Sequence, residues 1–252
     1  MKLPWVLQHP PLRVILVLTA MAGVAVGLVI PFLTLTARDR GVSLDAIGVM
    51  ASSYLIAQML LQLPMGVLSD RIGRRLPIAL GLLVEAGATV GYITADSALS
   101  FITLRVVQGV GLAMLYPALR ALIVDVTPNE RRGQAYAGFG AAYSAGLLFA
   151  PMLGGIVAET VGVNALFLSA AAVEVLVAIG GLVFLQGDAG PRPVVATGET
   201  ERIPFRALLV APLIGAFILS FASQFQIGLF SGIWSIYLAD IGASDFEVGL
   251  SF

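Results

Sequence analysis

The sequence predicts an all-α, polytopic membrane protein. Of its 252 residues, 58% are hydrophobic and 12% are charged, about half of the ~25% charged fraction usual for soluble domains. The mean hydropathy is +0.96, and apolar stretches of about 20 residues, the length of helix that crosses a bilayer core, recur along the chain. A soluble globular fold is excluded because the chain has too few charged residues to cover its surface.

Composition also excludes several chemistries. The formal net charge of −1 gives no basic excess, so we expect no nucleic-acid partner. The chain has no cysteine and one histidine, His9, which argues against disulfide scaffolds, thiolate metal sites and Ser-His-Asp catalysis. We expect no metal, no cofactor and no enzymatic activity. ATP-driven transport lacks support because no nucleotide-binding loop is present.

The apolar stretches predict seven transmembrane helices. The first is too long for the apolar core of a secretory signal and has no cleavage site after it, so we interpret it as a permanent helix. The predicted spans are 14–36, 46–66, 77–95, 99–124, 135–158, 164–185 and 207–238.

The distribution of positive charge predicts a cytoplasmic N-terminus in the cell membrane. On this topology Arg38 and Arg40 lie outside, while Arg105 and Arg120 fall within the fourth span. The cytoplasmic cations are then Lys2, Arg13, Arg71, Arg74, Arg75, Arg131, Arg132, Arg192, Arg202 and Arg206.

A polar linker and a repeat divide the chain. The stretch 186–206 separates a six-helix bundle, 1–185, from the segment 207–252. At an offset of 201 residues, this last segment matches the beginning of the chain, which predicts that it starts a second copy of the bundle with a seventh helix and the beginning of an eighth. The matched pairs are Pro11-Leu12 with Pro212-Leu213, Gly41 with Gly242, Ser43 with Ser244, and Gly48 with Gly249.

The loop after the second span carries the most specific motif, Gly-Val-Leu-Ser-Asp-Arg-Ile-Gly-Arg-Arg from Gly66 to Arg75. A tight hairpin explains Gly73, which can adopt a positive φ, and cytoplasmic retention explains the arginines. Neither explains Asp70. The decapeptide resembles the signature loop of the major facilitator superfamily at every fixed position.

This resemblance implies two six-helix bundles, each built from 3+3 inverted repeats, that rock about a central cavity. In that family the acid of the loop pairs with a helix of the other bundle, and the arginines pair with an acid at the end of the fourth helix. The corresponding gating residues here are Gly66, Asp70, Arg71, Gly73, Arg74 and Arg75, with Asp125 as the partner acid.

The fourth span contains a second motif, Arg-Val-Val-Gln-Gly-Val-Gly, beginning at Arg105. An arginine inside a span needs a partner, and the resemblance links this arginine to proton coupling. At about 100° per residue, Arg105, Gln108, Tyr116 and Arg120 share one face, which predicts a cavity wall. Alternatively, Arg105 and Gln108 bond a neighbouring backbone, and Arg120 extends to the cytoplasmic interface.

The fifth span ends in a segment that resembles the antiporter motif of the superfamily, with Ala150 in place of one glycine. We expect Pro151 to kink the helix, and Gly146, Gly154 and Gly155 to permit close crossing. The alternative is packing of small residues with no bearing on the direction of transport.

Two acids, Glu85 and Glu174, lie near the middle of the third and sixth spans, at similar depths in the two three-helix repeats. A buried carboxyl group is a candidate proton carrier. Against this, the third and sixth helices of the family usually pack outside the cavity, so a structural acid is the alternative. The first span has no acid, unlike multidrug members with a carboxylate there, which argues against export of cationic drugs.

The remaining cavity candidates are uncharged. They are Tyr54, Gln58 and Gln62 in the second span, and Gln224 and Gln226 in the seventh. Hydrogen bonds between packed helices explain them about as well as contacts with a substrate.

Together these features predict a secondary active transporter with alternating access, exporting a small or amphiphilic molecule and driven by the proton gradient. Its partners are the lipid bilayer, the substrate, and a second bundle from the same full-length chain or another subunit. Alternatives are an uptake carrier, a transporter of anionic or lipid-like substrates, and a non-transporting membrane protein. The chain of 252 residues by itself is not expected to transport, since the partner of Asp70 lies in the second bundle.

Overall fold

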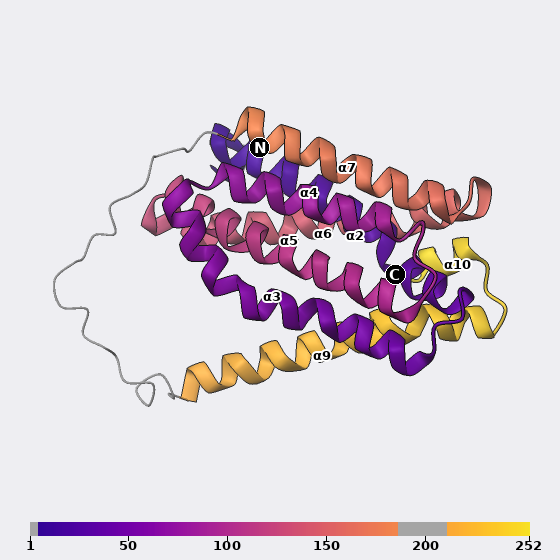
Figure 1. Ribbon diagram of the computed structural model, residues 1–252. Coiled ribbons are helices and arrows are strands. Elements are labelled where there is room, and N and C mark those ends of the chain that lie inside the picture. The colour runs from indigo at the N-terminus through magenta and orange to yellow at the C-terminus, as the bar shows by residue number, and fades with distance from the viewer. Residues whose placement is uncertain (1–4, 186–210) are drawn as a thin grey trace.

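A computed structural model describes residues 5–185 and 211–252, which form helices joined by short connections (Figure 1). No strand occurs in these two ranges. The helices are α1 (Trp5–Gln8), α2 (Pro10–Asp39), α3 (Leu44–Ile72), α4 (Arg75–Gly91), α5 (Ala98–Asp125), η1 (Asn129–Arg131), α6 (Arg132–Thr160), α7 (Val163–Phe184), α9 (Ala211–Asp240) and α10 (Asp245–Leu250).

Five helices in the described residues are long and apolar enough to cross a membrane: α2, α3, α5, α7, and α6 together with η1. Each contains or nearly matches a predicted span. The span predicted at 77–95 is α4, which ends at Gly91 after 17 residues and is therefore about 26 Å long, shorter than the ~30 Å bilayer core. The span predicted at 207–238 corresponds to α9, and the predicted linker, 186–206, lies outside the described residues.

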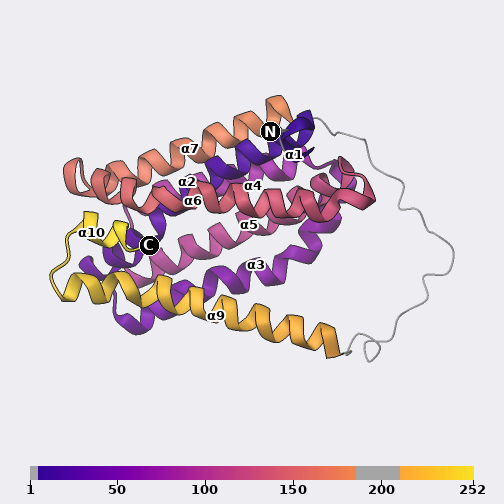
Figure 2. The same cartoon turned by 180° about the vertical axis from the view of Figure 1, so that it is seen from behind.

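The helix pairings reveal two related three-helix units. Helix α2 packs along α6, as α3 does along α5, and α4 packs on α5, as α7 does on α2 (Figures 1 and 2). If α2, α3 and α4 are exchanged with α5, α6 and α7 respectively, the α2–α6 pair becomes α5–α3 and the α4–α5 pair becomes α7–α2. The α4–α7 pair becomes itself. An offset of 89 residues carries the first residue of each of α2, α3 and α4 to the second residue of α5, α6 and α7. The pairs are Pro10 with Leu99, Leu44 with Gly133, and Arg75 with Asn164. This is the predicted 3+3 arrangement, with α4 and α7 meeting at its axis.

Glycines let the backbones of paired helices touch. A Cβ atom at Gly146 of α6 would collide with the carbonyl oxygen of Ala20 in α2. At the α4–α5 crossing, a Cβ at Gly81 would lie 2.6 Å from the carbonyl oxygen of Gly111. Lipid provides no hydrophobic drive for helix association, so this close van der Waals packing is a main source of bundle stability.

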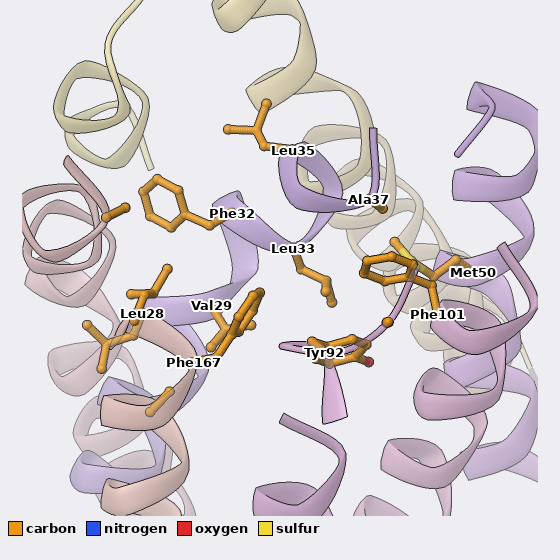
Figure 3. Packing of buried hydrophobic residues seen from close by; sticks show 14 of the residues in the cluster. Leu28, Val29, Phe32, Leu33, Leu35, Ala37, Met50, Tyr92, Phe101 and Phe167 are labelled. Atoms are coloured by element: carbon orange, nitrogen blue, oxygen red, sulfur yellow. The ribbon is translucent and has the colours of Figure 1, made fainter. Parts of the chain in front are cut away.

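An aromatic cluster closes one end of the bundle (Figure 3). The ring of Tyr92, directly after α4, lies 5.8 Å from the rings of both Phe101 and Phe167, which belong to α5 and α7. Leu33 of α2 and Met50 of α3 pack into the same fully buried cluster. The cluster therefore joins five helices at the end where α2 meets α3.

The turn between α9 and α10 repeats the turn between α2 and α3. Gly41 and Gly242, 201 positions apart, have φ values of +80° and +91°. Ser43 and Ser244 cap the following helices, and each side-chain oxygen accepts the backbone N–H three residues later at 3.3 Å. The offset seen in the sequence is thus also an equivalence of structure.

The packing of α2 on α6 gives a first prediction. We expect Gly146→Ala to lower the free energy of unfolding by about 1–3 kcal/mol, because the added methyl group overpacks the contact with Ala20. Gly140→Ala, in the same helix with open space around it, is the matched control and should be neutral or stabilising by up to about 1 kcal/mol. Unfolding midpoints in detergent distinguish the two, and equal midpoints would contradict the assigned contact.

Candidate functional site

The candidate residues are described relative to two ends of the bundle, each named by one residue. The Arg38 end comprises the C-terminal turns of α2 and α9 with α10, and the Asp70 end comprises the α3–α4 connection and the C-terminus of α5. The predicted gating residues lie at the Asp70 end. The predicted coupling residues lie between the two ends.

At the Arg38 end, α2 and α9 are joined by polar contacts. Arg38 forms an ion pair with Asp240 and donates a 3.2 Å hydrogen bond to the carbonyl oxygen of Ile236. The hydroxyl groups of Thr34 and Ser235, both buried, lie 2.8 Å apart. Thr34 and Ser235 are separated by the repeat offset of 201, so equivalent residues of the two copies contact each other. The sequence analysis missed this pair, although the offset together with a shared hydroxyl group could have indicated it.

The end of α6 packs on α10 at the Arg38 end. A Cβ atom at Gly155 would lie 2.5 Å from the carbonyl oxygen of Asp245, and one at Gly249 would collide with the carbonyl oxygen of Pro151. Gly154 faces α2 instead, with its Cβ position 2.7 Å from the carbonyl oxygen of Leu28. The glycines of the fifth span thus connect one helix to both copies of the repeat, and α6 is a single helix through Pro151.

At the Asp70 end, Arg74 is the central residue. Its Nη1 lies 2.5 Å from Oδ1 of Asp70 and donates to the hydroxyl of Ser69 at 3.1 Å, while its Nε lies 3.4 Å from Oδ2 of Asp125. The side chains of Arg74 and Asp125 are 13% and 17% exposed, whereas that of Asp70 is 56% exposed. Arg74 therefore ties the α3–α4 connection to the end of α5.

The glycines of this connection differ in their roles. Gly73 ends α3 with a φ of +90°, a conformation that favours glycine, as the hairpin interpretation predicts. Gly66 does not enforce a close helix approach, because its Cβ position lies 3.5 Å from Pro117, an ordinary van der Waals distance that alanine would satisfy. Arg71 is exposed and Arg75 is partly buried.

Arg105 and Gln108 belong to a network of side chains. Arg105 donates to Oε1 of Gln108 at 3.1 Å, and its guanidinium lies 5.2 Å from the ring centroid of Tyr54. The same Oε1 accepts a 2.8 Å hydrogen bond from the hydroxyl of Tyr92. Arg105 and Gln108 thus contact side chains, rather than the neighbouring backbone considered as an alternative.

The predicted single face of the fourth span is divided. Gln108 is 6% exposed and points into the bundle, whereas Arg120 is exposed. The guanidinium of Arg120 lies 5.7 Å from the ring centroid of Tyr116, and the hydroxyl of Tyr136 donates to its backbone carbonyl. The four predicted residues therefore do not form one continuous wall, because helix packing buries the middle of the face.

A cavity of about 50 Å³ lies inside the bundle, between α2, α4, α5, α6 and α7. Glu85, Glu174 and Tyr116 line it together with Tyr143, a residue that the sequence analysis missed. The sequence placed the two glutamates at similar depths but did not bring them together.

The uncharged cavity candidates of the second and seventh spans do not line this cavity in the described structure. Tyr54, Gln58 and Gln62 lie partly buried along α3, and Gln226 is exposed on α9. The side chain of Gln224 lies outside the described part of the structure.

Comparison with known proteins gives the family. Residues 15–252 match the model of the Major Facilitator Superfamily. The chain belongs to this superfamily. Its helical fold is therefore that of a family of membrane transporters.

Among the curated relatives is the quinolone resistance protein NorA of Staphylococcus aureus (strain N315), 25% identical over 221 residues, which cover 85% of this chain and 55% of NorA. The uncharacterized MFS-type transporter YhjO of Bacillus subtilis (strain 168) is 34% identical over 138 residues, 54% of this chain and 34% of YhjO. The chain thus spans about half the length of NorA, and its match to YhjO covers about a third of YhjO.

Two solved structures share the fold. They are crystal structures of a bacterial homolog to the human lysosomal transporter Spinster, inward-facing and unoccupied in one and inward-facing and occupied in the other. The match to the first structure has a TM-score of 0.75 at 18% identity, and it covers 100% of this chain and 59% of the chain in that structure. The match to the second structure has a TM-score of 0.74 at 16% identity, and it covers 95% of this chain and 56% of the chain in that structure.

The position of Arg74 gives a second prediction. We expect Arg74→Ala to lower the free energy of unfolding by about 1–3 kcal/mol, because it leaves the partly buried Asp125 without this ion pair. Arg71→Ala, in the same loop but exposed, is the control and should change stability by less than about 0.5 kcal/mol. Denaturation of both purified variants tests this, and a similar loss in both would contradict the role of Arg74.

Proposed function

We propose that this chain contributes to a secondary transporter that works by alternating access and exports a small amphiphilic molecule in exchange for protons. The observation that carries the proposal is the contact of α2 with α9 at the Arg38 end, between equivalent positions of two repeats. A transporter that rocks two bundles about a central site must make and break such a contact in each cycle.

The contact is suited to reversible closure. The ion pair of Arg38 with Asp240 is partly exposed, 36% and 54% for the two side chains, and exposed pairs contribute about 0–1 kcal/mol. The hydroxyl pair of Thr34 and Ser235 adds one neutral hydrogen bond, about 0.5–1.5 kcal/mol net. Contacts of this size hold one end closed without preventing it from opening when substrate binds.

Direction and energy source are supported by separate features. The similarity to NorA, whose name links it to quinolone resistance, favours export of a related amphiphilic compound. The excess of cations near the Asp70 end favours a cytoplasmic location for that end and for the N-terminus. Arg105, partly buried between Tyr54 and Gln108, is a fixed charge that a proton-dependent step can use.

A second candidate is a carrier of anionic or lipid-like substrates, in either direction. Arg120 favours it, because this exposed cation lies over the ring of Tyr116 and is available to an anion. Transport of an anionic amphiphile that is lost in Arg120→Gln but retained in Arg105→Gln would support this candidate over the first.

Transport assays test the proposed export. The protein, at the full length its gene encodes, is reconstituted into liposomes with a fluorescent quinolone as the probe. We expect a proton gradient to accelerate quinolone movement, and Arg105→Gln to reduce that acceleration by about tenfold or more, within the usual range of coupling between sites. Arg71→Gln, an exposed loop cation, is the control. Quinolone movement that ignores the gradient would contradict proton coupling, and no quinolone movement at all would contradict export of such a compound.

Cross-linking tests alternating access. In a cysteine-free background of the full-length protein, the double variant Thr34→Cys with Ser235→Cys introduces one thiol pair, at side chains whose oxygens are 2.8 Å apart. We expect oxidation to stop transport and reduction to restore it. Ser97→Cys with Ser100→Cys, whose hydroxyls lie 3.2 Å apart at the start of one helix, is the matched control and should transport in both states. Full transport by the oxidised Thr34–Ser235 variant would contradict the mechanism.

A further inference from the structure

The cavity inside the bundle contains an unusual pair of acids. Glu85 of α4 and Glu174 of α7 are 6% and 4% exposed and both line it. They are 89 positions apart, the offset that relates the two three-helix units, so they lie at equivalent places where α4 and α7 meet at the axis of the repeat. Two like groups are thereby brought together in the interior, and their charges interact.

The pair has no compensating cation in contact with it among the described residues. Arg105 is the cation whose charge acts on Glu85, but its guanidinium donates a hydrogen bond to Gln108 and lies over the ring of Tyr54. Oε1 of Glu85 and Oε2 of Glu174 are buried without a hydrogen-bond partner in the described structure. Two ionised carboxylates in such a site are costly because no cation in contact compensates them, and one proton bound by the pair lowers that cost.

A directed chain of hydrogen bonds connects the pair to Arg105. Arg105 donates to Oε1 of Gln108, Nε2 of Gln108 donates to the hydroxyl of Thr89 at 3.5 Å, and Thr89 hydrogen bonds to Glu174. Every donor in this chain points from Arg105 toward Glu174. The chain therefore ends on Glu174, whereas the described residues place no donor on Oε1 of Glu85, so we assign the bound proton to Glu85.

Among the described residues that line the cavity, Glu85 and Glu174 are the carboxyl groups. The other titratable and charged groups that interact with the pair are Tyr54 from α3, Tyr92 directly after α4, Arg105 and Tyr116 from α5, and Tyr143 from α6. Helix α2 contributes apolar side chains and Thr19, whose hydroxyl donates to the carbonyl oxygen of Ile15. The exchangeable proton is therefore assigned to the two carboxyl groups.

We propose that Glu85 and Glu174 together bind one exchangeable proton inside the amino-terminal bundle, and that Thr89 and Gln108 link the occupancy of this site to the position of Arg105. The proposal rests on the proposed proton-coupled function and adds its proton site. When Arg105 turns toward a substrate or counter-charge, Gln108 loses one donor, the stabilisation of Glu174 weakens, and the affinity of the pair for its proton changes. By reciprocity, protonation changes how strongly Arg105 is held.

Difference infrared spectroscopy of the full-length protein in lipid tests the site without requiring transport. We expect a carbonyl band of a protonated carboxylic acid that titrates with pH. Glu85→Gln should remove it, while Glu174→Gln and Gln108→Leu should each shift its midpoint by about one pH unit, a tenfold change in proton affinity. Glu159→Gln, an exposed acid at the end of α6, is the control that leaves the band unchanged.

Two results would overturn the proposal: a band that persists in Glu85→Gln, or a midpoint unmoved in both Glu174→Gln and Gln108→Leu. Loss of the band on adding sodium at fixed pH would also overturn it, in favour of a metal-cation site. The test is separate from that of the proposed function. Gradient-independent transport with an intact band contradicts proton coupling alone, whereas gradient-driven transport without the band contradicts the glutamate pair alone.

Discussion

Direct contact between helix backbones is the constraint on which the rest of this structure depends. In lipid, apolar side chains gain nothing from leaving their surroundings, so helices are held by close packing and by polar contacts. The Gly146–Ala20 and Gly81–Gly111 approaches are such contacts, and each leaves no space for a methyl group. They hold α2 on α6 and α4 on α5, which are the pairings that define the repeat.

The same contacts position the polar groups. A Cβ atom at Gly111 would lie 3.0 Å from Oε1 of Glu85, so the last glycine of the fourth-span motif provides the space in which this carboxyl lies. Gly109, two residues earlier, lets α5 approach the backbone of α3 at Tyr54, the residue under the guanidinium of Arg105. The motif that begins at Arg105 thus sets both the packing of α5 and the surroundings of the charges.

How much of this was predictable depends on the range of each interaction. The positions of the spans, the φ of Gly73 and the repeat offset can be read from the sequence, and the structure agrees with them. The shortness of α4 was missed, because hydropathy continues past Gly91 into a turn that Arg40 stabilises by donating to the carbonyl oxygens of Tyr92 and Ala95. The split face of α5 and the meeting of Glu85 with Glu174 depend on which side of a helix its neighbours cover, and a single sequence does not contain that information.

The contact of Thr34 with Ser235 has a consequence for how such a chain could have arisen. If both bundles descend from one duplicated ancestor, this position faced its own copy across a two-fold axis, where a residue must complement itself. A hydroxyl does so, because it both donates and accepts. Arg38 shows where the copies have since diverged: its equivalent in the second repeat is Ala239, while Asp39 corresponds to Asp240, so a single ion pair remains where symmetry would allow two.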